Sequence, residues 1–155
     1  MNQVDVRAKL AELGLELPVA AIPVGAYVPA IRTGNLVFTA GQLPLVNGVM
    51  AGVGKVDGEI TPDRAKELAQ ICALNCLAAV ETVADVNKIT KIVRVVGYVN
   101  GVAGYINQPA VVNGASELFL AIWGDRARHA RSAVGIAELP LNAPVEIELT
   151  VEITD

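Results

Sequence analysis

The chain has 155 residues and a mass of 16.2 kDa, a length at which we expect one domain (residues 1–155) around one hydrophobic core. The formal net charge of −4 and the pI near 5.0 argue against nucleic-acid binding, and the charge-free stretches 17–31 and 33–54 are broken by proline and glycine, which argues against a membrane span. Charged residues make up 18% of the chain, against a typical ~25%, so we expect a homo-oligomer that buries part of the apolar surface.

The N-terminal residues predict a short helix followed by an irregular arm. Apolar residues recur at positions 4, 6, 10 and 13 with charged residues between them, and Gly14 follows as a stop signal. Residues 1–5 lack the basic-then-apolar order of an export signal, so we expect a cytoplasmic protein. Across residues 17–31, three prolines and a glycine exclude a regular helix and predict an extended arm that carries Tyr27.

Turn signals follow the arm. Residues 32–35, Arg-Thr-Gly-Asn, predict a β-hairpin between segments 27–31 and 36–40. Asn47-Gly48 is a possible second hairpin tip in a glycine-rich segment. Gly41, directly after the first hairpin, is either simple punctuation or a point where a ligand approaches backbone N–H groups closely.

Helices are predicted in the middle of the chain. Thr61 is an N-cap with proline at the first helical position, and an apolar stripe then runs to about residue 83, which predicts a helix lying deep against a sheet. A second helix is predicted to start near residues 107–109 and to end before residue 124. Asn113 and Gly114 are poor helix formers in its first half, so we expect another interaction to offset their cost.

The strand patterns complete the predicted architecture. Residues 91–100 are mostly apolar, with Arg94 as the interruption, which predicts an interior strand covered on both faces. Over residues 145–153 apolar and polar residues alternate strictly, so one strand face belongs to the core and the other is acidic and solvated. The element order predicts an α+β domain, a mixed or antiparallel sheet with two main helices on one face, and self-association over the other face.

Common catalytic signatures are absent from the sequence. We find no G-x-S-x-G, phosphate loop, H-E-x-x-H or dinucleotide fingerprint, and we expect no cofactor and no metal. Cys72 and Cys76 lack a second Cys or His pair for zinc, so we interpret them as buried thiols, with redox or metal chemistry as the alternative. His129, the single histidine, has no evident acidic partner, which favours a turn or packing role over catalysis.

Arg131 and Glu146 carry the strongest chemical signals. Arg131 has small apolar neighbours and offers a guanidinium to a carboxylate or phosphate, or else forms a surface or interface salt bridge. Glu146 shares a strand face with Glu148 and Glu152, which is either a solvated acidic edge or the place of one general base. If residues 139–144 close a simple hairpin, Arg131 lies opposite Glu152 and about 20 Å from Glu146, so two chains must supply a site that uses both.

Six short segments form a pattern that is more specific than any one of them. They are Gly25-Ala26-Tyr27-Val28, Phe38-Thr39-Ala40-Gly41-Gln42-Leu43-Pro44, Val112-Asn113-Gly114, Ala130-Arg131-Ser132, Leu139-Pro140 and Val145-Glu146-Ile147-Glu148. In this order and combination, over about residues 23–153, the chain resembles the RidA/YjgF family, also called the L-PSP endoribonuclease-like family.

The resemblance implies a chorismate-mutase-like α+β fold, here with an N-terminal extension (residues 1–22) that carries an extra short helix. It also implies a homotrimer with sheets lining a central barrel and three clefts between subunits. Family members with the arginine hydrolyse reactive 2-imino or enamine acids to 2-keto acids and ammonia. By position, Arg131 would bind the substrate carboxylate, Glu146 would activate the attacking water, and Tyr27, the backbone at Gly41 and Asn113 would shape the pocket.

The chain departs from the family pattern at two pocket positions. Ala133 stands where the family often has Cys, and Ala40 where it often has Ser; the longer segment 47–59 also indicates a longer branch of the family. The carboxylate anchor and the acid remain, so the reaction class is better supported than the substrate. The alternatives are a non-catalytic small-acid binding protein that uses the same cleft and a ribonuclease or translation inhibitor, against which the acidic charge and lone histidine argue.

Overall fold

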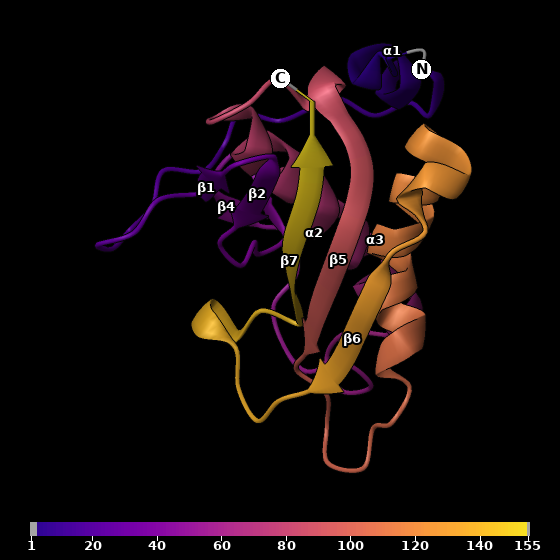
Figure 1. The fold of residues 1–155 in the computed structure, drawn as a ribbon. Coiled ribbons are helices and arrows are strands. Elements are labelled where there is room, and N and C mark those ends of the chain that lie inside the picture. Colours follow the sequence, from indigo (N-terminus) through magenta and orange to yellow (C-terminus); the bar gives the residue numbers. More distant parts are fainter. Residues whose placement is uncertain (1–2, 155) are drawn as a thin grey trace.

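The computed structural model describes residues 3–154, so residues 1, 2 and 155 of the expected domain lie outside the described residues. A mixed β-sheet forms one layer, and helices α2 (Pro62–Glu81) and α3 (Gln108–Trp123) form a second layer on one of its faces (Figure 1). The expected α+β arrangement with the main helices on one face is confirmed. Within the described residues, no helix has the length and apolar character needed to cross a membrane.

The sheet has the strand order β1-β2-β7-β5-β6 within the described residues. Its strands are β1 (Ala30–Thr33), β2 (Leu36–Thr39), β5 (Ile89–Val99), β6 (Ala130–Gly135) and β7 (Val145–Ile153). The remaining elements are α1 (Val6–Glu12), β3 (Leu45–Val46), β4 (Val49–Met50), and the 3-10 turns η1 (Val86–Lys88), η2 (Gly124–Ala127) and η3 (Pro140–Asn142).

Both predicted hairpin turns are confirmed. The pairing of Thr33 with Leu36 joins β1 and β2 through a two-residue turn. The β3–β4 hairpin turns at Asn47 and Gly48, whose φ angles of 50° and 78° are the left-handed values that a tight hairpin turn needs. The first hairpin begins at Ala30 rather than at residue 27, because Pro29 has no N–H to extend the ladder.

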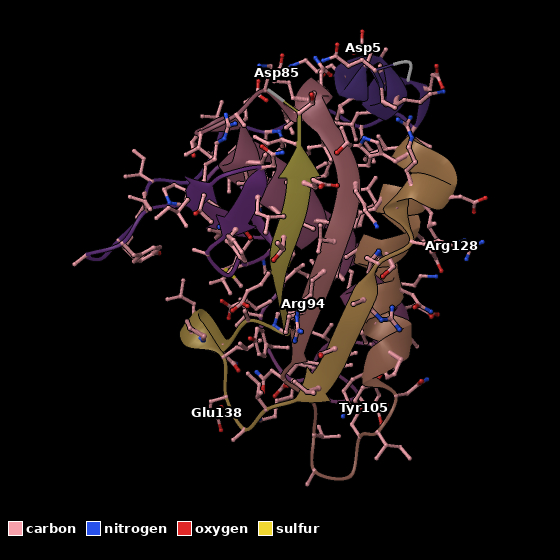
Figure 2. All side chains as sticks on the ribbon, viewed as in Figure 1. Asp5, Asp85, Arg94, Tyr105, Arg128 and Glu138 are labelled. Atoms are coloured by element: carbon pink, nitrogen blue, oxygen red, sulfur yellow. The ribbon has the colours of Figure 1, made fainter. Side chains whose placement is uncertain are left out.

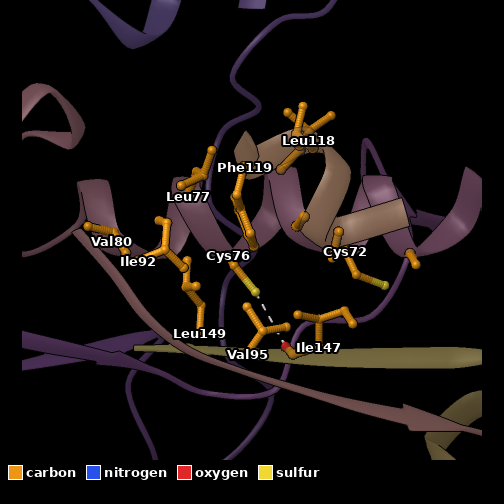
Figure 3. Packing of buried hydrophobic residues seen from close by; sticks show 14 of the residues in the cluster. Cys72, Cys76, Leu77, Val80, Ile92, Val95, Leu118, Phe119, Ile147 and Leu149 are labelled. Carbon is orange, nitrogen blue, oxygen red and sulfur yellow. Dashed lines mark hydrogen bonds between the residues drawn. The ribbon is translucent and has the colours of Figure 1, made fainter. Parts of the chain in front are cut away.

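Helix α2 packs against the sheet through its buried face. The Thr61 hydroxyl accepts a hydrogen bond from the Arg64 N–H at 3.2 Å and caps the helix start, as predicted. Cys72 and Cys76 are buried and free. The Cys72 thiol donates to the Val145 carbonyl, and the Cys76 thiol donates to the Ile147 carbonyl, as Figure 3 shows for the second bond. Burial raises the pKa of both thiols, so they remain protonated donors and the interpretation as plain buried thiols is confirmed.

The expected hairpin between the last two strands is wrong. Strand β6 pairs in parallel with β5, and β7 lies between β2 and β5, so β6 and β7 are not neighbours. Helix α3 is the crossover that a parallel pair requires, and it places β6 at the sheet edge. Arg131 is therefore level with Val95 of β5 and does not face Glu152.

The face of the sheet away from the helices is open in this chain and carries polar side chains (Figure 2). The alternation in β7 is confirmed: its apolar residues are buried, whereas Glu146, Glu148 and Thr150 are partly exposed. Strand β5 is interior in the sheet order, as expected, but only one of its faces is covered, and Arg94 is exposed on the other. The prediction that both faces of β5 are covered is thus not met within one chain.

Gly114 lies where α3 crosses α2, and a Cβ added there would collide with the backbone carbonyl oxygen of Lys66. Gly114→Ala is expected to lower the free energy of unfolding by about 1–3 kcal/mol, because the backbones of α2 and α3 must move apart to make room for the methyl group. This sign is opposite to the gain of about 1 kcal/mol that alanine brings to an open helix position. Urea unfolding measures the change.

The matched control is Ala121→Gly on the exposed surface of the same helix, which should cost up to about 1 kcal/mol. A Gly114→Ala variant as stable as the parent would contradict the close helix contact.

Candidate functional site

Arg131 projects from the edge strand β6 toward α3 rather than toward the open face of the sheet. Its Nη1 donates to Asn113 Oδ1 at 2.7 Å and to Ser116 Oγ at 3.2 Å. Asn113 and Ser116 are three residues apart in α3, so they lie on the same side of the helix. These partners are neutral and the arginine is exposed, so they leave the guanidinium charge available to an anion.

A second group of predicted residues lies around the start of β7. Gly41 follows β2, and a Cβ added there would collide with the Glu146 carboxylate. The Gln42 N–H donates to the Ile147 carbonyl at 2.8 Å, which holds this segment against β7. Tyr27, half-exposed on the arm, lines a cavity of about 620 Å³ together with Gly41 and Gln42. The structure therefore places Gly41 against Glu146, and Tyr27 on a cavity that Gly41 also lines.

Glu146 has an electrostatic environment that suits a general base. Burial raises the pKa of Glu146, and the negative charge of Glu148 raises it further. Glu148 itself accepts a hydrogen bond from the Tyr98 hydroxyl at 3.1 Å. A half-buried carboxylate with a raised pKa holds a proton more readily than an exposed one, which is the property that general acid–base work requires.

The two groups are separate within one chain. Arg131 is level with Val95, whereas Glu146 is level with Tyr98, three positions farther along β5. With β5 between them, two strand spacings and three residues put their Cα atoms about 14 Å apart. Their side chains also leave opposite faces of the sheet. The expected separation of about 20 Å rested on the wrong strand pairing, but the structure still does not bring Arg131 and Glu146 together in one chain.

His129 has the packing role predicted for it. Its ring is half-buried and lies edge-on to Phe119, with 6.3 Å between ring centroids. Burial lowers the pKa of His129, which favours the neutral ring. Its Nε2 lies 3.0 Å from Ser116 Oγ, the same hydroxyl that contacts Arg131.

Ser116 is not among the residues predicted from the sequence. The available signal was its spacing of three residues from Asn113 on a predicted helix, which places both side chains on one face. As for metals, residues 3–154 contain no group of three or more His, Cys, Asp or Glu side chains arranged to hold an ion.

Comparison with known proteins gives consistent matches over nearly the whole chain. A family model described as "YjgF/chorismate mutase-like, putative endoribonuclease" matches residues 7–153. Protein TCP17 of Trypanosoma cruzi is 35% identical over 97% of this chain and 95% of its own length. A 2-iminobutanoate/2-iminopropanoate deaminase of Dermatophagoides farinae is 32% identical over 90% of this chain and 94% of its own.

A solved structure matches equally well. The crystal structure of the Agrobacterium tumefaciens protein Atu1372, with unknown function, superposes with a TM-score of 0.89 and 42% identity. The match covers 96% of this chain and 92% of that chain.

The raised pKa of Glu146 predicts a stability cost at neutral pH. Folding favours the protonated carboxyl, so the stabilising contribution is present below the pKa of the unfolded chain and is lost as pH rises through the raised folded value. Glu146→Gln, which is neutral and similar in shape, is therefore expected to raise the free energy of unfolding at pH 7, and the gain should shrink as the pH is lowered. Thermal unfolding across this pH range measures it.

Glu152→Gln is the matched control, since Glu152 is exposed on the same strand and should respond little. A Glu146→Gln variant less stable than the parent at pH 7 would show that the carboxylate is not penalised by burial.

Proposed function

We propose, from the premise that this chain belongs to the YjgF/chorismate mutase-like family, that the chain hydrolyses reactive 2-imino or enamine acids to 2-keto acids and ammonia. This family is the RidA/YjgF family. The observation that carries the proposal is Arg131, an exposed guanidinium whose hydrogen-bond partners among residues 3–154 are the neutral Asn113 and Ser116. Such a group binds a carboxylate. The names of the deaminase relatives support the same reaction class.

The roles of the residues follow from the reaction. Arg131 holds the substrate carboxylate, with Asn113 beside it. Water adds to the carbon of the protonated C=N bond while Glu146 accepts one proton from the water, giving a neutral tetrahedral carbinolamine. Glu146 returns this proton to nitrogen, the C–N bond breaks, the hydroxyl proton passes to Glu146 as the carbonyl forms, and ammonia leaves. We assign the pocket wall to the backbone at Gly41, which lies against Glu146, and to Tyr27, which lines the same cavity as Gly41.

A complete site of this kind needs two copies of the chain. Arg131 and Glu146 are about 14 Å apart on opposite sheet faces, so we assign Arg131 and Asn113 to one subunit and Tyr27, Gly41 and Glu146 to its neighbour. A homotrimer whose open sheet faces surround a central barrel provides three such clefts. The exposed cross-strand pair Ile31 and Phe38, 60% and 40% exposed, fits burial of that face in an assembly.

The proposal also covers the compartment and the two positions, Ala40 and Ala133, that depart from the family pattern. The free, buried cysteines fit a reducing compartment, so we place the activity in the cytoplasm. Ala133 packs against the core, and the Ala40 carbonyl accepts from Gln42 Nε2 at 3.2 Å. Neither side chain has a polar group for the reaction, so the proposal assigns a reaction class and leaves the substrate side chain open.

The same arginine also supports a second candidate, a small-acid binding protein without turnover. An exposed guanidinium binds a keto or amino acid whether or not a base is in place. A rise in melting temperature with such acids, together with no imine hydrolysis, would favour this candidate. Nuclease activity is disfavoured, because the net charge is −4 and His129 is held as a neutral packing residue.

Arg131→Ala is expected to slow imine hydrolysis by about 100-fold or more, because it removes two hydrogen bonds to a charged carboxylate, each contributing about 1.5–3 kcal/mol. The measurement is ammonia release from imino acids that an amino-acid oxidase generates in situ. Arg128→Ala is the matched control, since Arg128 is exposed and paired with Asp125 at 2.9 Å. Failure of the parent to accelerate hydrolysis of several imino acids would overturn the proposal.

The acid limb of the pH profile is expected to report Glu146. Activity should fall as the pH drops through the raised pKa of Glu146, because the base becomes protonated. Glu148→Gln removes the neighbouring negative charge and should move this limb to lower pH, although burial of Glu146 keeps it above the ordinary glutamate range. The measurement is kcat/KM against pH, with Glu152→Gln as the control; an unmoved limb in Glu148→Gln would contradict the assignment.

A further inference from the structure

A chain of hydrogen bonds runs from the backbone at Ala127 to the guanidinium of Arg131. It passes through the His129 ring and the Ser116 hydroxyl. The His129 Nδ1 contacts the Ala127 carbonyl, and a carbonyl oxygen can only accept. Nδ1 therefore carries the proton, and Nε2 of the neutral ring is left as an acceptor.

The Ser116 hydroxyl then has one possible arrangement. Arginine can only donate, so Ser116 Oγ accepts from Arg131 Nη1 at 3.2 Å. The hydroxyl has one proton of its own, and it donates this proton to His129 Nε2 at 3.0 Å. Each donor in this series of hydrogen bonds therefore has a defined acceptor. We call the series, from Arg131 through Ser116 and His129 to the Ala127 carbonyl, the relay.

The arrangement also determines which edge of the guanidinium has no hydrogen bond to the part of the chain that the structure describes. Nη1 has two protons; one is donated to Ser116 Oγ and the other to Asn113 Oδ1 at 2.7 Å. The protons that remain lie on Nε and Nη2, which together form the side edge of the planar group. A carboxylate binds an arginine through two parallel N–H bonds, and this edge offers such a pair.

The relay is anchored in the core. The His129 ring lies edge-on to Phe119, at an interplanar angle of 84°, and Phe119 is fully buried. Ser116 is buried as well, although Arg131 itself is exposed. An exposed arginine ordinarily samples many rotamers, and fixing its Nη1 to buried groups reduces that freedom before a ligand arrives.

We propose that Ser116 and His129 are positioning residues that hold Arg131 with its Nε/Nη2 edge turned to the substrate carboxylate. The identity of the substrate rests on the proposed function, whereas the orientation of the arginine applies to any small carboxylate at this site. Loss of the relay should weaken carboxylate binding and raise KM, with a much smaller effect on kcat, because the arginine contacts the carboxylate in ground and transition states alike.

Binding of 2-oxobutanoate to the full chain, measured by isothermal titration calorimetry, tests the relay without requiring turnover. Ser116→Ala is expected to weaken binding by about 5- to 10-fold, the effect of one ordinary hydrogen bond, because the lost contact orients Arg131 and does not itself touch the acid. Ser116→Thr keeps the hydroxyl and should restore binding. His129→Phe keeps a ring beside Phe119 but accepts no hydrogen bond and should resemble Ser116→Ala, whereas the amide oxygen of His129→Gln can accept from Ser116 and should recover part of the affinity.

The same variants are compared in steady-state hydrolysis of 2-iminobutanoate, and melting temperatures identify any that fail to fold. A merely structural role predicts that Ser116→Ala and His129→Phe bind 2-oxobutanoate like the parent, and that result would overturn the inference. It would also be overturned if the parent bound no 2-oxobutanoate. If the parent binds the acid through this relay but hydrolyses no imine, the positioning role stands and the proposed function fails.

Discussion

The parallel pairing of β5 with β6 is the constraint on which both parts of the candidate site depend. Parallel neighbours need a crossover, and α3 supplies it, so β6 lies at the sheet edge beside that helix. Arg131 consequently faces Asn113 and Ser116 of α3. Strand β7 returns on the other side of β5, between β5 and β2, which puts Glu146 in the interior of the sheet and on its open face. The pairing therefore separates the proposed carboxylate anchor, Arg131, from the proposed base, Glu146, within each chain.

Helix α3 meets two demands in consecutive residues, and each explains a residue that is poor for a helix. Gly114 permits the close approach to the Lys66 carbonyl, and Asn113 supplies the oxygen that contacts Arg131. Similar compromises recur near Glu146, where Gly41 leaves room for the carboxylate and burial disfavours its charge. Helix propensity is low at Asn113 and Gly114, and the contacts that these two residues permit offset that cost.

Local features of the fold were predictable because each depends on neighbouring residues. The Thr61 cap, the Asn47-Gly48 turn and the alternating faces of β7 were all predicted, and the structure has them. The RidA/YjgF resemblance and the chorismate-mutase-like fold that it implies are confirmed by the family match. The β6–β7 pairing was predicted wrongly, because strands adjacent in sequence usually pair and residues 136–144 resemble a turn. The contact of His129 with Ser116 could likewise not be predicted from the sequence, because Ser116 belongs to another element.

By itself, the sequence determined the element types, the core faces of α2 and β7, and the identity of the residues able to bind a carboxylate or activate water, because these depend on side-chain chemistry and short-range periodicity. Only the tertiary structure decided which strands pair and on which face each group lies. It also joined Ala127, His129, Ser116 and Arg131 into a directed relay. Strand order and hydrogen-bond direction arise from contacts between segments distant in sequence, and no local pattern specifies those contacts.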